Sequence, residues 1–216
     1  MKKIKFFVTF SNILRINNKN EMKFIVKYCG SFGFIKPWTA VRDSKTKSCD
    51  YLTPSILMGI ERKLFPEISR NENGKLNTIE RYRLSFQDIS FQQESTRSIN
   101  YERTGDKKHF IANASTIKRG LLINPVLYIM FNSKEHAEIA LSQHICLCRN
   151  EDILLPIELI KLDNESEFDD EIRFSGYESF SCEMNDNNSI YCGLNKYTKN
   201  NQYIIRKIFG MPENLQ

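Results

Sequence analysis

The stretch RSINYERTGDKKHFIANASTIKRGLLINPVLYIMF, Arg97 to Phe131, decides the fold of this chain. Its first part is basic, with only Glu102 and Asp106 set against Arg97, Arg103, Lys107, Lys108, His109, Lys118 and Arg119. Its second part, residues 121–131, is apolar at both alternating sets of positions, which predicts one strand buried on both faces. We therefore expect an exposed basic hairpin anchored by a buried strand, and we expect the hairpin to contact an anionic partner.

The charges of the 216 residues are distributed unevenly. Lys and Arg number 31 and Asp and Glu number 26, which gives a net charge of +5. Residues 163–171 (DNESEFDDE) contain six acids and no base, whereas residues 97–119 contain six Lys or Arg and two acids. This asymmetry predicts an anionic partner for one face of the protein. It also predicts that 163–171 is a solvated loop that links to a separate C-terminal piece.

The six cysteines do not indicate a metal site. No Cys-x-x-Cys pair occurs, and no second Cys/His pair has ligand spacing. Cys146 and Cys148 alternate within an apolar run, which predicts two thiols on one face of a strand. We therefore predict free, buried, reduced thiols, no metal, no cofactor and a cytoplasmic location. The apolar run in MKKIKFFVTF is too short for a signal peptide, and no 18-residue apolar stretch exists, so we predict no membrane contact.

The periodicity of the chain predicts an α+β fold. In order, it indicates a strand from Met22, a helix opened by Thr53-Pro54, a strand over 79–91, the basic hairpin, the apolar strand, a helix capped by Ser133 and strands over 145–160. Two crossover helices over one antiparallel sheet make a ferredoxin-like, RRM-like βαββαβ domain, which we place at residues 1–162. Residues 163–216 are predicted to form a small β-rich C-terminal extension.

Two of these elements have predicted inner and outer faces. In the first helix, Leu57, Ile60 and Leu64 form the inner face, and Glu61 is expected to face solvent with Arg62 and Lys63. In the strand over 79–91, alternation predicts that the even positions Tyr82, Leu84 and Phe86 are buried, and that the other face carries Arg81, Arg83, Ser85 and Gln87.

Four segments together resemble a known family. They are KYCGSFGFIKP (27–37), YLTPSILMGIE (Tyr51 to Glu61), the Arg-Thr of YERTGDKKHF with the following Asn124-Pro125 and Tyr128, and LCRNEDIL (Leu147 to Leu154). In this order and spacing they resemble the Cas-five proteins of the RAMP superfamily, which are subunits of the type I CRISPR surveillance complex called Cascade. The resemblance covers roughly residues 22–160, and Cys148 stands where the family usually has glycine.

The resemblance implies a RAMP fold with an extended β-hairpin thumb, here about residues 92–120. It implies a protein that caps the CRISPR RNA (crRNA), grips its repeat-derived 5′ handle and contacts the backbone subunit and the large subunit. Whether it also contacts target DNA near the flanking motif stays open. The predicted RNA-binding residues are the cations of the hairpin, which would meet phosphates, and two residues of the loop before the first helix: Arg97, Arg103, Lys107, Lys108, His109, Lys118, Arg119, Trp38 and Arg42.

The sequence favours binding over catalysis. Some members of the family cut precursor crRNA without metal, using a Tyr that closes the first helix and a Lys-His pair that opens the second. Here Phe65 ends the first helix and has no hydroxyl, and Glu135 separates Lys134 from His136. We therefore predict no catalytic residue. Two alternatives remain open, a metal-independent endoribonuclease using His136 and Lys134, or His109, and a stand-alone RNA-binding protein of ferredoxin-like fold.

Overall fold

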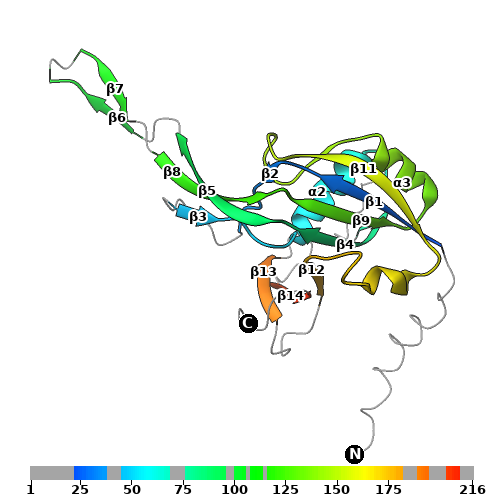
Figure 1. Cartoon of the computed structure of the whole chain (residues 1–216). Coiled ribbons are helices and arrows are strands. Elements are labelled where there is room, and N and C mark those ends of the chain that lie inside the picture. The colour runs from blue at the N-terminus through cyan, green and yellow to red at the C-terminus, as the bar shows by residue number, and fades with distance from the viewer. Residues whose placement is uncertain are drawn as a thin grey trace, which may run out of the picture.

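The computed structural model of the chain describes residues 22–37, 45–68, 76–95, 100–105, 108–113, 116–181, 189–194 and 203–209. These residues form an α+β structure that is mostly strands, with two α-helices. Figure 1 shows a core domain from which a long two-stranded hairpin projects, with a small sheet near the C-terminus on another side. In the part of the chain that is described, no helix has the length and apolarity needed to cross a membrane.

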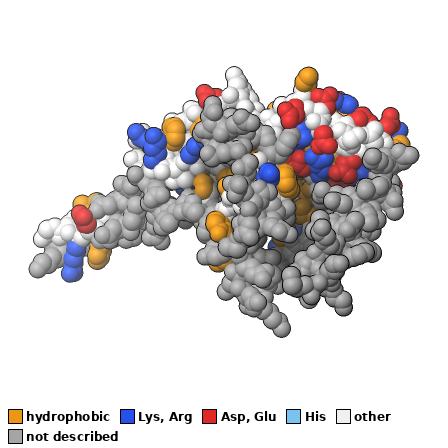
Figure 2. All heavy atoms as spheres, turned by 90° about the horizontal axis from the view of Figure 1, so that it is seen from below, with side chains coloured by type: hydrophobic (Ala, Val, Ile, Leu, Met, Phe, Trp, Pro, Cys, Tyr) orange, Lys and Arg blue, Asp and Glu red, His pale blue; other side chains and the backbone are white. Residues whose placement is uncertain are grey.

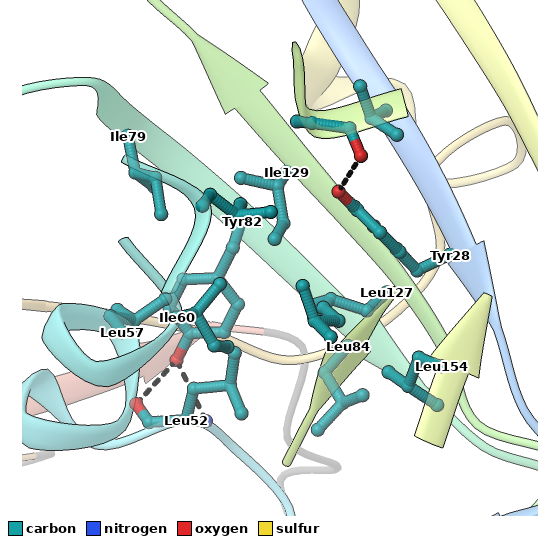
Figure 3. Packing of buried hydrophobic residues seen from close by; sticks show 14 of the residues in the cluster. Tyr28, Leu52, Leu57, Ile60, Ile79, Tyr82, Leu84, Leu127, Ile129 and Leu154 are labelled. Atoms are coloured by element: carbon teal, nitrogen blue, oxygen red, sulfur yellow. Dashed lines mark hydrogen bonds between the residues drawn. The ribbon is translucent and has the colours of Figure 1, made fainter. Parts of the chain in front are cut away.

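The core contains a five-stranded sheet in which every neighbouring pair is antiparallel. Its strands, in spatial order, are β10 (Ile145–Cys146), β11 (Ile153–Leu162), β1 (Lys23–Cys29), β9 (Val126–Phe131) and β4 (Ile79–Ser85). The helices α2 (Pro54–Leu64) and α3 (Lys134–Leu141) pack on one face of this sheet, because their apolar residues share one buried cluster with Val26 and Tyr28 of β1. Figure 3 shows how closely these side chains interlock.

Both predicted helix starts are confirmed. Thr53 precedes α2 in an extended conformation, and Pro54 takes the first helical position, where its missing N–H would have no partner in the helix. Ser133 caps α3, and its side-chain oxygen accepts a hydrogen bond from the backbone N–H of His136. Ala137 and Ala140 then turn the inner face of α3 onto the sheet.

The prediction that Glu61 faces solvent is wrong. Its side chain is only 3% exposed, and its Oε1 accepts hydrogen bonds from the backbone N–H of Asn77 and Thr78 at 2.8 and 2.6 Å. The hydroxyl of Thr78 donates a third bond at 2.8 Å. This carboxylate therefore ties α2 to the start of β4, with backbone donors in place of water.

The acidic segment 163–171 exposes most of its carboxylates, as predicted, but it is not a loop throughout. It contains a short 3-10 helix, η1 (Glu165–Asp169), which begins with a capping box between Asn164 and Glu167. Phe168 of η1 and Phe174 beyond it are fully buried, in one cluster with Ile25 of β1 and with Met130 and Leu162. The segment therefore covers the face of the core sheet opposite the two helices.

This cover also explains Arg83, which was predicted to lie on an outer face. Arg83 is 1% exposed, and its guanidinium donates to the carbonyl oxygen of Phe174 at 2.7 Å and lies 5.2 Å from the Phe168 ring centre. Its neighbour Arg81 donates to both carboxylate oxygens of Glu178, at 2.9 and 2.8 Å. The strand β4 is therefore buried on both faces at this point.

The apolar stretch 121–131 forms two strands, where the sequence predicted one. β8 (Thr116–Ile123) ends just before Asn124, whose φ of 49° lies in the left-handed region. β9 begins after Pro125. The predicted strand 79–91 also divides, into β4 and β5 (Asp88–Ser95). The two breaks lie side by side, because the side-chain amide of Asn124 donates to Gln87 Oε1 at 2.7 Å and the Gln87 N–H donates to the Ile123 carbonyl at 2.9 Å.

Beyond these breaks the chain forms the projecting hairpin of Figure 1, residues 88–123, which we call the arm. β5 and β8 pair from Asp88↔Ile123 to Ser95↔Thr116 without a bulge. β6 (Asn100–Arg103) and β7 (Phe110–Asn113) form the far end. At the base, the other edge of β8 pairs with β2 (Phe32–Gly33) and with β3 (Lys45–Lys47), which widens the arm to a sheet.

The C-terminal strands form a third layer beside β4. Their order is β12 (Glu178–Ser181), β14 (Tyr203–Phe209) and β13 (Ser189–Leu194). The buried hydroxyl of Tyr82 connects them to the core, since it donates to the Leu52 carbonyl at 2.9 Å, lies 2.7 Å from Ser179 Oγ and accepts from the Ser179 N–H at 3.1 Å (Figure 3 shows the bond to Leu52).

We expect Tyr82→Phe to lower the free energy of unfolding by about 1–3 kcal/mol, because it leaves buried backbone and hydroxyl groups without their partner. Urea denaturation would measure the loss. Tyr191→Phe is the matched control, since Tyr191 is 48% exposed and water can replace its hydroxyl contacts. Equal stability of Tyr82→Phe and wild type would contradict the role assigned to the Tyr82 hydroxyl.

Candidate nucleic-acid interface

The arm carries the predicted RNA-binding residues that the structure describes. These are Arg103, Lys108, His109, Lys118 and Arg119. Arg97, Lys107, Trp38 and Arg42 lie outside the described residues. The five described residues do not form one cluster, because three lie at the far end of the arm and two lie on β8, nearer to the core.

The far end of the arm combines cations with exposed apolar side chains. The turn between β6 and β7 is held by Thr104, whose N–H and hydroxyl both donate to the His109 carbonyl, at 3.0 and 2.9 Å. Next to it, Phe110 is 66% exposed, and the guanidinium of Arg103 lies 6.0 Å from its ring centre. Lys108 and His109 are exposed on the same turn. An exposed ring among cations is the combination that stacks on bases and neutralises phosphates.

A second exposed ring with a cation above it lies on the shaft of the arm. Phe91 of β5 is 47% exposed, and the ammonium of Lys45 lies 4.4 Å above its ring centre. Lys118 of β8 is paired in register with Lys45 of β3, and is exposed. Gly120, opposite Phe91, leaves room for the ring, since a Cβ there would lie 3.1 Å from a Phe91 ring carbon. Neither ring was among the predicted RNA-binding residues, because Phe91 ends the strand predicted over 79–91 and only the cations of the hairpin were considered.

Arg119 differs from the other arm cations because its charge is already paired. Its Nε donates to Glu94 Oε2 on β5 at 2.8 Å, and the other oxygen of Glu94 accepts from Arg149. Arg149 also binds the fully buried carboxylate of Asp152, at 2.7 Å. The guanidinium groups of Arg119 and Arg149 lie 5.0 and 5.5 Å from the ring centre of Phe34. The binding of RNA by Arg119 stays a prediction, and its first role is structural.

This network joins the arm to the loop between β10 and β11. The sequence analysis missed Glu94, because it lies 55 residues from Arg149 and before the basic stretch. The hydrogen bond and the charge of Asp152 raise the pKa of the Arg149 guanidinium, so this partner of Glu94 stays charged at any working pH. Glu94 therefore ties the outer part of the β5–β8 pair to the loop between β10 and β11.

The acidic side chains lie mostly away from the arm. In Figure 2 most Asp and Glu side chains gather at the end of the core domain farthest from the arm. Some of the acids of the core domain are paired, as are Glu165 and Asp169 of η1 with Arg81 at 3.6 and 2.8 Å. Charge separation of this kind favours the approach of a polyanion to the arm.

His136, the alternative catalytic residue, lies beside Phe65 at the opposite side of the domain core from the arm cations. The Asn132 Nδ2 donates to the Asn77 carbonyl, so its Oδ1 faces His136 Nδ1, 2.7 Å away. Nδ1 also lies 3.0 Å from Ser133 Oγ. Because an amide oxygen only accepts, the contact with Asn132 fits a ring that carries a proton on Nδ1. The Phe65 ring centre is 5.1 Å from that of His136 and offers no hydroxyl. Lys134 is exposed and pairs with Glu138 at 3.2 Å.

The two thiols of Cys146 and Cys148 do not share a strand face, which corrects that prediction. β10 ends at Cys146, whose thiol donates to the Asn150 carbonyl at 3.7 Å, while Cys148 Sγ accepts from the Lys36 N–H at 3.4 Å. Among the described residues, no group of three or more His, Cys, Asp or Glu side chains is placed to hold a metal ion.

Comparisons with known proteins give structural matches only. No family model matches the sequence, and no curated protein matches it. The chain is similar to a solved "CRISPR RNA-guided surveillance complex" chain, with a TM-score of 0.48 and 12% identity over 88% of this chain and 89% of that one. It is also similar to a CRISPR protein from Archaeoglobus fulgidus, with a TM-score of 0.40 and 11% identity over 91% and 88% of the two chains.

We expect Glu94→Gln to lower the free energy of unfolding by about 1 kcal/mol. The glutamine amide oxygen can accept a hydrogen bond from one guanidinium, but the amide N–H groups then face the other guanidinium. The expected loss is small because both ion pairs are partly solvated. Glu102→Gln on β6 is the control, because Glu102 is exposed and its removal changes the charge of the arm equally. Thermal or urea denaturation of the two variants would be compared, and an equal effect of both would rule out a special role for Glu94.

Proposed function

We propose that this chain is a crRNA-binding subunit of a type I CRISPR surveillance complex and a member of the Cas-five family. The arm binds the repeat-derived 5′ handle, and the core domain docks onto the backbone and large subunits. The observation that carries this proposal is the arm itself, in which the exposed rings of Phe91 and Phe110 each have a cation beside them, Lys45 and Arg103 respectively. The four segments that resemble the family support it independently.

The order of the core strands supports a ferredoxin-like, RAMP-type domain. Leaving out the short β10, the order is β11-β1-β9-β4, which is fourth, first, third and second along the chain of the βαββαβ unit. α2 lies between β1 and β4, and α3 between β9 and β11, and both cover the same face. The arm leaves this unit between its second and third strands, where the thumb is expected.

The geometry of the arm suits single-stranded RNA better than a duplex. Sequence-tolerant binding of single strands uses cations along the backbone and rings on which bases stack. The arm offers Arg103 and Lys108 beside Phe110, and Lys45 and Lys118 beside Phe91. The two groups are separated along the hairpin, so one strand could pass both.

The core domain also exposes a surface suited to another subunit. Ile153, Leu155 and Ile157 of β11 are 43, 56 and 60% exposed, an apolar stripe of the kind found at protein interfaces. We assign this stripe to the contact with a neighbouring subunit. Contact with target DNA and a cytoplasmic location stay predictions.

We expect the affinity for repeat-derived RNA to fall with salt, with a log–log slope of about −3.5 if about five phosphates are neutralised. Arg103→Gln with Lys118→Gln should make this slope shallower by about 1.4, since each contact contributes about 0.7. Phe110→Leu should weaken binding about tenfold with the slope unchanged, because stacking involves no counterion release. Fluorescence anisotropy at several salt concentrations measures both quantities.

The control for these variants is Arg173→Gln, which removes one exposed cation from the acidic end of the core domain. A change of slope with Arg173→Gln equal to that of the arm variants would mean that binding is not localised to the arm.

The alternative function is metal-independent cleavage of precursor crRNA at the repeat. One observation favours it, namely that the His136 ring lies next to Phe65, the position where cleaving relatives are expected to have Tyr. A base at Nε2 could take the 2′-hydroxyl proton, but the Phe65 ring can neither donate nor accept one. We therefore favour binding without cleavage.

We expect repeat-containing RNA to be bound and left intact in EDTA by wild type and by His136→Ala. Denaturing gels follow the RNA, and a melting curve verifies that the variant is folded. A single cut by wild type at a defined phosphate, abolished in His136→Ala, would establish the alternative instead. Purification of the chain alone, without a multi-subunit ribonucleoprotein, from cells that contain the whole system would favour a stand-alone RNA-binding protein.

A further inference from the structure

A hollow of about 500 Å³ lies between α2 and the loop that joins β10 to β11, separate from the arm and from His136. From α2 it is lined by Ser55, Gly59 and Lys63, which are spaced by four residues and therefore lie in one row along the helix. From the other side it is lined by His144 and Asn150. All five residues are exposed, and the Ser55 hydroxyl also lies 3.0 Å from Thr53 Oγ1.

The hollow combines a few polar groups with an apolar floor. It contains one lysine, Lys63, and the histidine His144, and no carboxylate belongs to the described residues that line it; the rest of the lining is Ile56, Ile60, Cys146, Leu147 and Cys148. Another hollow, of about 530 Å³, also contains cations, but there Arg81 is bonded to Glu178 and Asp169. A hollow with cationic and neutral donors and no acid is complementary to a small anion.

Gly59 gives a second, independent indication. Glycine is a poorer helix former than alanine inside a helix, and Gly59 is in the middle of α2. A Cβ at this position would meet no atom within 4 Å in the described structure, so no neighbour within the protein requires glycine. The absence of a side chain there leaves the helix backbone open to close approach from outside, at the centre of the row from Ser55 to Lys63.

We propose that this hollow is a phosphate-binding site, which holds a phosphate group of a nucleic-acid strand. A phosphate has three or four oxygens that point in different directions, and the donors here come from two elements on opposite sides. Lys63 and Ser55 contribute an ammonium and a hydroxyl, and His144 and Asn150 contribute a ring N–H and an amide. The site includes no residue of the arm, so it can be tested separately from the proposed function.

The site can be tested with inorganic pyrophosphate on the full chain, followed by NMR of the histidine rings. The chain has three histidines, so single His→Gln variants would assign each ring signal. We expect pyrophosphate to shift the His144 signals and to raise the pH at which they titrate, since a bound anion favours imidazolium. The signals of His109 and His136 serve as internal references. No shift of His144 at saturating pyrophosphate would overturn the proposal.

Gly59→Leu separates binding from folding. Leucine is among the better helix formers, so we expect an equal or higher melting temperature, together with at least tenfold weaker pyrophosphate binding because the side chain fills the hollow. Gly59→Ala should give an intermediate loss. Lys63→Gln should weaken pyrophosphate binding at least fivefold. Lys161→Gln, which changes an exposed lysine of β11, should leave the binding unchanged. Unchanged affinity in Gly59→Leu would exclude this hollow as the site.

Three further ligands identify the source of the phosphate. If pentanucleotides with a 5′-phosphate and with a 5′-hydroxyl both shift His144, an internal phosphodiester occupies the site. If only the 5′-phosphorylated strand does so, the site holds a terminal phosphate, and both results support the proposal. Glutarate carries two carboxylates, and binding of glutarate as tight as that of pyrophosphate would overturn it in favour of an acidic protein segment. Arm variants should leave the pyrophosphate response unchanged.

Discussion

The paired break at Gln87 and Asn124 is the constraint on which the rest of the structure depends. Two adjacent strands leave the core sheet at the same level, and the Asn124 side chain bonds to Gln87 across them. The Asn124 N–H donates to the Ser31 carbonyl at 3.0 Å, and the Gly30 N–H donates to the Pro125 carbonyl at 3.1 Å, so the bend is also fixed to the end of β1. The continuous apolar run 121–131 can therefore contribute one strand to each of two sheets. The bend also fixes the direction in which the arm leaves the core.

Although the net charge is small, charged side chains have different roles at the two ends of the molecule. At one end the carboxylates of Asp169 in η1 and Glu178 in β12 bind Arg81. At the other end, Lys45 and Arg103 lie beside the exposed rings of Phe91 and Phe110. Glu94 places a carboxylate between Arg119 and Arg149 and so ties the arm to the loop between β10 and β11.

The sequence allowed correct predictions for residues that act on their neighbours in the chain. It did not reveal contacts between residues that are far apart in the chain. Caps such as Ser133 and Thr53-Pro54 act within one turn, so both helix starts could be predicted. Glu61 and Arg83 were misplaced because periodicity records polarity but not the partners that a buried charge finds. The Asn124-Pro125 dipeptide is a turn signal in the sequence. The break was not predicted because apolar residues lie on both sides of this dipeptide.

The unbroken register of β5 and β8 has a consequence for how the arm can vary among related proteins. Successive side chains alternate between faces, so one added residue in each strand would carry Phe91 and Lys118 to the opposite side of the ribbon. Two added residues in each strand would restore the faces and lengthen the arm by about 7 Å. Arms in this lineage should therefore differ in reach by even steps, with odd changes tolerated only where a bulge compensates.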